Sequence, residues 1–127
     1  MLFVGTSIIH PSTEGVFLLC NILDLLIYSN KKIFFGKDVL VSWECLFMDT
    51  DFHQIMDNKT DRCINEDRDI YISDRVWFGC KCIVLKGSEI LRDTVIAAGS
   101  IVSGKQTVHS CVIADGEVIK SDVSWIR

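Results

Sequence analysis

Proline and basic residues are scarce in this sequence of 127 residues. Proline occurs once, at Pro11, and glycine eight times, which excludes a collagen-like chain and a Pro/Gly-rich linker. Only 13 residues are Lys or Arg against 17 Asp or Glu, so the formal net charge is −4. Nucleic acid is therefore not an expected partner, because its binding requires a basic surface that neutralises phosphates.

The six cysteines contain no CxxC pair, which argues against a zinc ribbon. They are Cys20, Cys45, Cys63, Cys80, Cys82 and Cys111. The first residues lack both the basic segment and the small-residue cleavage site of a secretory signal. Reduced thiols in the cytoplasm are therefore the expected state.

No apolar run is long enough to span a bilayer, so we expect a soluble protein without a transmembrane segment. The longest run covers residues 15–28 and is interrupted by Asp24. We interpret it as a buried helix or a pair of core strands, with a peripheral membrane contact as the alternative. Because 49% of the residues are hydrophobic, the chain is expected to fold around a core rather than remain disordered.

An apolar residue recurs at every sixth position through much of the chain. The series comprises Ile72, Phe78, Val84, Ile90, Ile96, Val102 and Val108, with Phe35, Val41 and Phe47 upstream. A second apolar position lies two residues earlier, at Ile33, Val39, Cys45, Ile70 and Val76, and slips by one residue at Val95. A period of six matches neither a helix at 3.6 residues nor a single strand at two.

A chain that turns a corner every six residues accounts for this period. Three hexads close a triangular coil, so each inward side chain stacks on its counterpart eighteen residues later. Ile72 is then expected to stack on Ile90 and Val108, and Phe78 on Ile96. Glycines suit the tight corners, and they are Gly36, Gly79, Gly87 and Gly99. The predicted fold is all-β, a parallel β-helix of hexapeptide repeats.

The domain organisation predicted from this period is a single domain over residues 1–127. Its β-helix covers residues 33–113, preceded by an irregular N-terminal coil or cap at residues 1–32. The C-terminal tail, residues 114–127, ends in a Trp-Ile pair that is expected to pack on the last coil or on a neighbouring subunit.

The register of the repeat breaks between Phe47 and Ile72, whose separation is not a multiple of six. The most polar stretch of the chain, residues 50–69, lies in this interval. It is predicted to be an excursion loop that leaves the coil after Asp49 and rejoins it near Ile70. Long loops in compact repeats are commonly functional.

Two stretches resemble the signature of the hexapeptide-repeat acyltransferases. They are VWFGCKCIVLKG at residues 76–87 and VIAAGSIV at residues 95–102. Upstream, FGKDVL at residues 35–40, followed by SW at 42–43 and DTDFH at 49–53, resembles the branch that acts on sugars and surface polysaccharides. The resemblance covers roughly residues 33–120. It implies a left-handed β-helix, acetyl-CoA or another acyl-CoA as donor, and a homotrimer with a coenzyme groove between subunits.

The resemblance also implies roles for individual residues. The catalytic histidine of the family maps onto His53, and the coenzyme contacts map onto Gly79-Cys80 and Ala98-Gly99, largely through backbone groups. Trp77 is expected to pack at the corner, with a coenzyme-binding place in the wall of the groove as the alternative. A lysine that meets the coenzyme phosphates maps near Lys105, one residue later than in the family pattern. The tail motif is also shortened, to Asp115-Gly116-Glu117.

The chemistry expected at His53 is general base catalysis. A sugar hydroxyl must lose its proton to attack a thioester, and histidine, with an ordinary pKa near ~6.5, accepts protons at neutral pH. Asp49 and Asp51 alternate with His53, so in an extended segment the three side chains would share one face. One carboxylate is expected to orient the imidazole, with a metal-binding set as the alternative. No metal is expected, and the oxyanion donor is a backbone N–H of an unspecified corner.

The predicted function is transfer of an acetyl group from acetyl-CoA to a hydroxyl of a sugar or surface-polysaccharide precursor. A serine-type small-molecule acetyltransferase is an alternative for the acceptor. A zinc-dependent hydrolyase is disfavoured, because His10, His53 and His109 lack the spacing of a three-histidine site. A non-catalytic scaffold is the other alternative, favoured by the degenerate hexads and opposed by His53 within its motif.

Overall fold

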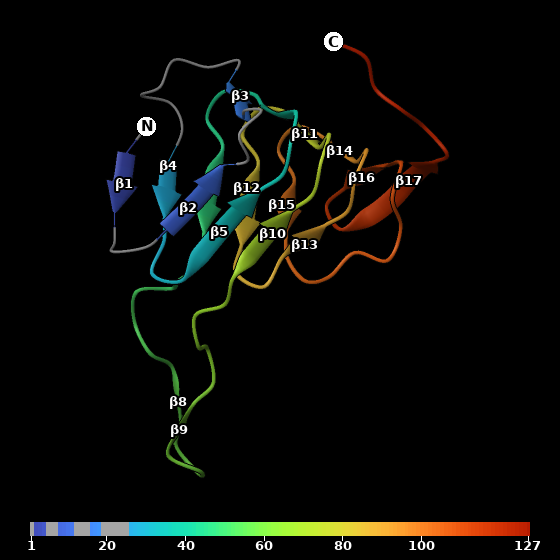
Figure 1. Ribbon diagram of the computed structural model, residues 1–127. Helices are drawn as coiled ribbons and strands as arrows, with labels where there is room; N and C mark the ends of the chain where they lie inside the picture. The colour runs from blue at the N-terminus through green and yellow to red at the C-terminus, as the bar shows by residue number, and fades with distance from the viewer. Residues whose placement is uncertain (1, 5–7, 12–15, 19–25) are drawn as a thin grey trace.

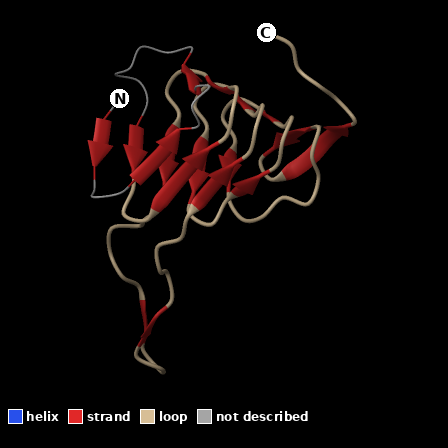
Figure 2. Ribbon diagram, in the orientation of Figure 1, coloured by secondary structure: helices blue, strands red, loops and turns tan. Residues whose placement is uncertain are grey.

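The computed structural model describes residues 2–4, 8–11, 16–18 and 26–127, with side chains from Leu26 onward. All regular elements of this described part are β-strands (Figure 2). The apolar run at residues 15–28 contributes two of them, β3 (Val16–Leu18) and β4 (Leu26–Tyr28), so the interpretation as a pair of strands is confirmed for its described residues. Among the described residues there is no helix that could cross a membrane.

The strands wind into a stack of triangular coils with three faces (Figure 1). Face A contains β1 (Leu2–Val4), β4, β7 (Leu46–Met48), β12 (Ile83–Leu85) and β15 (Ile101–Val102). Face B contains β2 (Ile8–Pro11), β5 (Lys32–Phe35), β10 (Ile70–Ile72) and β13 (Glu89–Ile90). Face C contains β3, β6 (Val39–Val41), β11 (Trp77–Phe78), β14 (Val95–Ile96), β16 (Cys111–Ala114) and β17 (Glu117–Ser121). The predicted parallel β-helix is confirmed.

The core is the predicted inward column. Phe78 pairs in register with Ile96, and Val84 with Val102, each eighteen residues later. The inward residues are almost completely buried. Three phenylalanines form the widest layer, since the Phe47 ring contacts Phe35 and Phe78 edge-to-face with centroids 5.2 and 5.1 Å apart.

Two details of the predicted register are wrong. The position two residues before Ile96 is filled by Thr94, which is fully buried, so Val95 is not an inward residue that has slipped. Ile96 pairs with Ile113, seventeen residues later, because the last coil is one residue short. This deletion leaves Val108 37% exposed instead of stacked on Ile90.

Left-handed backbone conformations form columns along the corners. Between faces B and C, Asp38, Arg75, Asp93 and Ser110 occupy equivalent positions with φ of 54°, 55°, 55° and 51°. Between faces C and A, the corresponding residues are Glu44, Lys81 and Gly99. A non-glycine residue in this region costs roughly 1–2 kcal/mol. The corners therefore require a left-handed backbone conformation. Because most of these positions are not glycine, the sequence did not reveal this requirement.

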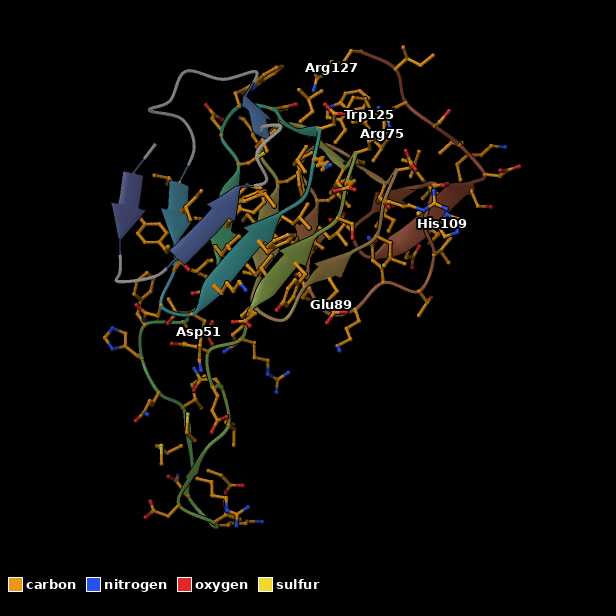
Figure 3. The ribbon with its side chains drawn as sticks, in the orientation of Figure 1. Asp51, Arg75, Glu89, His109, Trp125 and Arg127 are labelled. Carbon is orange, nitrogen blue, oxygen red and sulfur yellow. The ribbon has the colours of Figure 1, made fainter. Side chains whose placement is uncertain are left out.

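The N-terminal strands form one end of the stack of coils, and the C-terminal strand β17 lies at the other end. The described strands β1, β2 and β3 pair in parallel with β4, β5 and β6, so they form a coil and not a helix. At the other end β17 pairs antiparallel with β16. The tail then returns to the stack, where Trp125 Nε1 donates to the carbonyl of Arg75 at 2.8 Å and the Arg75 guanidinium lies over the indole (Figure 3). Ile126 remains exposed.

Candidate active site

The predicted excursion leaves the corner between faces A and B. It contains an antiparallel hairpin of β8 (Met56–Asp57) and β9 (Arg62–Cys63) that projects away from the coils (Figure 1). Phe47 pairs with Val84, 37 residues later, instead of the 18 residues that separate Val84 from Val102. The excursion is therefore an insertion that leaves the register of the coils on both sides unchanged.

Asp49 closes the corner at the base of the excursion. Its carboxylate is fully buried and accepts hydrogen bonds from Ser29 Oγ at 2.6 Å and from the backbone N–H groups of Asn30 and Lys31 at 2.7 and 3.0 Å. These three donors satisfy a charge that would otherwise be costly to bury. The hypothesis that Asp49 orients the imidazole of His53 is therefore wrong, because the Asp49 carboxylate is hydrogen-bonded to the segment 29–31 of the neighbouring coil instead.

The segment that carries His53 is bent rather than extended. Phe52 adopts a left-handed conformation with φ of 65°, and its N–H donates to Thr50 Oγ1 at 3.1 Å. Its ring lies edge-to-face on Tyr28, with centroids 5.3 Å apart. The predicted sharing of one face by Asp49, Asp51 and His53 is thus wrong. In the described part of the chain, no three His, Cys, Asp or Glu residues are arranged to hold a metal.

Asn65 ties the two limbs of the excursion together around His53. Its Nδ2 donates to the carbonyl of His53 at 2.9 Å and to Asp51 Oδ2 at 3.0 Å, and its Oδ1 accepts from the N–H of Ile55 at 2.6 Å. Lys86, on the coil, donates to the Asp51 carboxylate and to the carbonyl of Asn65. The side-chain hydrogen bond from Lys86 is the main reason that the pKa of Asp51 lies below its ordinary value. This arrangement anchors the backbone of His53 to the β-helix.

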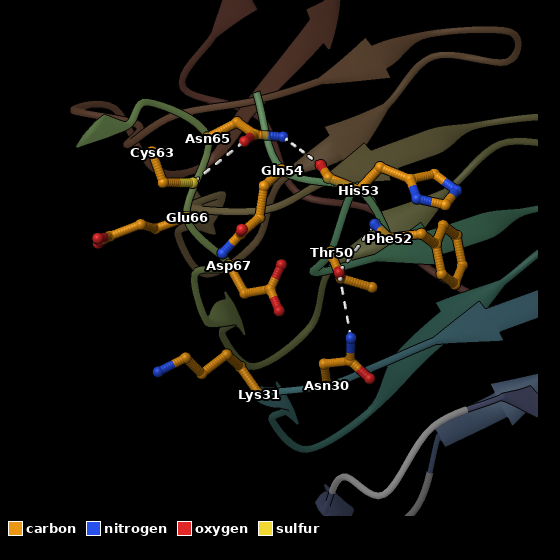
Figure 4. Close-up of a pocket in the computed structure, with 10 residues that line it drawn as sticks. All are labelled: Asn30, Lys31, Thr50, Phe52, His53, Gln54, Cys63, Asn65, Glu66 and Asp67. Carbon is orange, nitrogen blue, oxygen red and sulfur yellow. Dashed lines mark hydrogen bonds between the residues drawn. The ribbon is translucent and has the colours of Figure 1, made fainter. Parts of the chain in front are cut away.

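A cavity of about 640 Å³ lies between the excursion and the corner (Figure 4). It is lined by Asn30, Lys31, Thr50, Phe52, His53, Gln54, Cys63, Asn65, Glu66 and Asp67. The imidazole of His53 is exposed and points away from Asp67 and Glu66 in this view (Figure 4). Among the described residues none makes a hydrogen bond to the imidazole, so both ring nitrogens are accessible to a ligand.

The predicted coenzyme residues lie at a different corner, between faces C and A. A Cβ on Gly79 would lie 2.6 Å from the backbone N of Ala98, so the close contact of these coils requires glycine. The Gly99 N–H donates to the carbonyl of Cys80 at 2.8 Å. The N–H groups of Cys80 and Ala98 have no acceptor within the described residues. Such unpaired donors on a partly exposed corner fit the carbonyl groups of an acyl-CoA.

Trp77 and Lys105 have contacts that the sequence did not predict. The Trp77 ring lies 6.1 Å from that of Trp125, centroid to centroid, and its Nε1 donates to Ser42 Oγ at 3.4 Å. Lys105 forms an ion pair with Glu89 on face B at 3.0 Å. Trp77 directly precedes the Gly79 corner, whereas Lys105 and His53 lie across face A from it. Within one chain the predicted base and the predicted coenzyme corner are therefore separated.

Cys63, Cys80, Cys82 and Cys111 are free thiols, as predicted. Cys82 and Cys45 stack inside the corner between faces C and A, and each Sγ contacts a carbonyl, of Ala97 at 3.3 Å and of Gly79 at 3.2 Å. These contacts place Cys82 inside the corner as a packed residue. Cys20 and the side chain of His10 lie outside the described residues.

Comparison with known proteins gives a consistent set of relatives. No protein-family profile matches the chain. Over 102 residues it is 31% identical to a galactoside O-acetyltransferase of Lactococcus lactis subsp. lactis (strain IL1403), which covers 78% of this chain and 45% of the relative. The polysialic acid O-acetyltransferase OatWY superimposes with a TM-score of 0.77 at 28% identity, over 81% of this chain and 50% of that one.

The chain is similar in sequence and in fold to the sugar O-acetyltransferases of the hexapeptide-repeat family. The polySia-specific acetyltransferase NeuO, at 29% identity and a TM-score of 0.76, covers 82% of this chain and 46% of its own. A maltose O-acetyltransferase of Clostridium difficile 630 shares the fold, with a TM-score of 0.57 at 20% identity. The left-handed β-helix of this hexapeptide-repeat family is confirmed for the chain. The chain spans about half the length of the galactoside and polysialic acid O-acetyltransferases that it matches.

Proposed function

We propose that the protein transfers an acetyl group from acetyl-CoA to a hydroxyl of a sugar or surface-polysaccharide precursor, with His53 as the general base. The observation that carries this proposal is the geometry around His53. His53 lines a cavity of polar groups, its imidazole is exposed, and its backbone is held to the coil through Asn65. One relative is named as a galactoside O-acetyltransferase and another as a polysialic acid O-acetyltransferase. Both names support the same reaction class.

In the proposed reaction His53 accepts the proton of the acceptor hydroxyl while the hydroxyl oxygen forms a bond to the acetyl carbon of acetyl-CoA. The C–S bond of the thioester breaks, and the imidazolium returns the proton to the leaving sulfur. Direct attack requires no nucleophile from the protein. The N–H groups of Cys80 and Ala98 are the candidates for stabilising the carbonyl oxygen. The same corner, with Trp77 and Gly99, would hold the donor. Lys105, which lies across face A from this corner within one chain, would meet the phosphates of a donor held by a neighbouring subunit.

We further propose a homotrimer, because the outer surface of face A is apolar. Two rows of outward side chains run along it, Leu26–Leu46–Ile83–Ile101 and Tyr28–Met48–Leu85, alternating with the inward residues. All are partly exposed in the single chain, and Ile101 is 53% exposed. A contiguous apolar surface of this kind is typical of a protein–protein interface. Face A of one copy packed against two others would bury it.

A trimer of this kind would also reunite the separated site residues. With three copies of face A turned toward a three-fold axis, the corner between faces A and B of one copy adjoins the corner between faces C and A of the next. His53 of one chain would then lie beside the Gly79 and Ala98 corner of its neighbour. Each trimer would contain three such sites, in agreement with the intersubunit groove that the resemblance implies.

Ile83→Glu is expected to prevent trimer formation, because it places a charge in the centre of the apolar surface of face A. We expect light scattering to give three chain masses for the unaltered protein and one for the variant, with loss of acetyl transfer. Ile119→Glu is the matched control, since Ile119 lies on β17 and is exposed outside face A. A trimeric Ile83→Glu protein, or a monomeric unaltered protein, would contradict the proposed interface.

The function itself is tested by following thiol release from acetyl-CoA in the presence of neutral and anionic glycans. We expect release that depends on the acceptor, together with a product that carries an additional acetyl ester by mass spectrometry. A folded trimer that acetylates no glycan would favour the scaffold alternative. That alternative has one observation in its favour, namely the shortened last coil between Val102 and Cys111.

A further inference from the structure

The cavity beside His53 has the polar chemistry of a sugar site. Three side-chain amides line it, those of Asn30, Gln54 and Asn65, together with the hydroxyl of Thr50. Amides both donate and accept hydrogen bonds, as sugar hydroxyls do. The ring of Phe52 is 52% exposed at the same cavity, and an exposed aromatic ring packs well against the C–H groups of a sugar.

The charged residues that line this cavity are predominantly acidic. Glu66 and Asp67 contribute two carboxylates, and Lys31 is the one lysine or arginine among the described lining residues (Figure 4). Lys86 lies nearby on the coil but is engaged by Asp51 and by the carbonyl of Asn65. Its side chain is only 19% exposed. Because the Asp51 carboxylate forms an ion pair with Lys86, the charge of Lys86 is already neutralised.

The charge of the whole excursion has the same sign as the cavity. Residues 50–69 contain six acidic and three basic residues, a net charge of −3: Asp51, Asp57, Asp61, Glu66, Asp67 and Asp69 against Lys59, Arg62 and Arg68. The entire chain has a net charge of −4. A surface of one sign lowers the local concentration and the association rate of a ligand of the same sign.

We infer that the cavity accepts a neutral sugar and discriminates against polyanionic glycans, including polysialic acid. This inference rests on the proposed acetyltransferase function and concerns its acceptor. Polysialic acid carries one carboxylate per sugar unit, and an unpaired carboxylate beside Glu66 and Asp67 is unfavourable. The chain therefore differs in acceptor class from the two polysialic acid O-acetyltransferases whose fold it shares with TM-scores of 0.77 and 0.76.

The test compares kcat/KM for methyl galactoside, maltose and polysialic acid with the unaltered trimer and acetyl-CoA. We expect at least about a tenfold preference for a neutral acceptor. Glu66→Lys is expected to shift the ratio toward polysialic acid by about tenfold while the KM for acetyl-CoA is unchanged. Asp61→Lys is the matched control. It makes the same charge change in the hairpin turn, at a residue that does not line the cavity. Asp61 has a left-handed backbone conformation, and Lys81 shows that a lysine is accommodated in that conformation elsewhere in the chain.

The outcomes separate this inference from the proposed function. Acetylation of polysialic acid in preference to both neutral sugars would overturn the inference and leave the acetyltransferase function standing. Equal shifts for Glu66→Lys and Asp61→Lys would also overturn it, because the discrimination would then come from the overall charge and not from the cavity. Absence of acetylation with every acceptor would instead contradict the function itself.

Discussion

His53→Ala is expected to reduce acetyl transfer by about 10²–10⁴-fold, because the acceptor hydroxyl then has no base within reach. The substitution removes an exposed side chain to which no hydrogen bond is made within the described part of the chain. The fold, the trimer and the affinity for acetyl-CoA are therefore expected to be preserved. Steady-state kinetics, circular dichroism and calorimetric titration with acetyl-CoA measure these quantities.

The control for this substitution is His109→Ala. His109 is also exposed, and its Nδ1 is 2.9 Å from the hydroxyl of Ser110, on the corner between faces B and C. It lies outside the cavity that contains His53. We expect almost unchanged transfer in this variant. Full activity of His53→Ala, or an equal loss in both variants, would contradict the assignment of the base.

Phe47→Ala is expected to destabilise the protein by about 3–5 kcal/mol, the largest effect on stability among these predictions. Phe47 is completely buried and lies between the rings of Phe35 and Phe78. Neighbouring coils are held in register by their strand pairs, so they cannot close around the vacated space. Denaturant unfolding measured on the trimer at one fixed chain concentration determines the change.

Phe34→Ala is the control for the core substitution. Phe34 is adjacent to the inward Phe35 on β5, but its side chain points outward and its ring lies 6.1 Å from that of Tyr71. Because it is partly exposed, its removal creates no closed cavity, and we expect a loss below about 1.5 kcal/mol. A comparable loss at both positions would indicate that the layer around Phe47 relaxes.

The β-helix was predictable because its inward positions accept a narrow set of side chains. Each inward residue faces the same confined centre, so the period of six persists from Phe35 to Phe47 and again from Ile72 to Val102. The register of the last coil was not predictable. Val108 is apolar and continues the period, whereas the deletion that exposes it becomes visible only when Ile96 is found opposite Ile113.

The candidate site was predictable only where a local motif marks it. His53 lies in a recognisable segment, but Asn65 lies in a polar stretch without a pattern and meets Asp51 fourteen residues away. Lys86 was part of a recognised motif without an assigned role, and it reaches Asp51 across 35 residues. The bend at Phe52 depends on Thr50 and Tyr28 together, so alternation of residue types alone suggested an extended segment that does not exist.

The position of the excursion has a consequence for how this protein can change. The insertion begins and ends at one corner, between Asp49 and Ile70, and the strands on both sides keep their pairing. The entropy of closing a loop grows only slowly with its length, so longer or shorter versions would be tolerated. The proposed acceptor site, most of whose lining residues lie on the excursion, is thereby largely separable from the core. Exchange of this segment between relatives is a route to new acceptors that leaves the strand pairing of the coils unchanged.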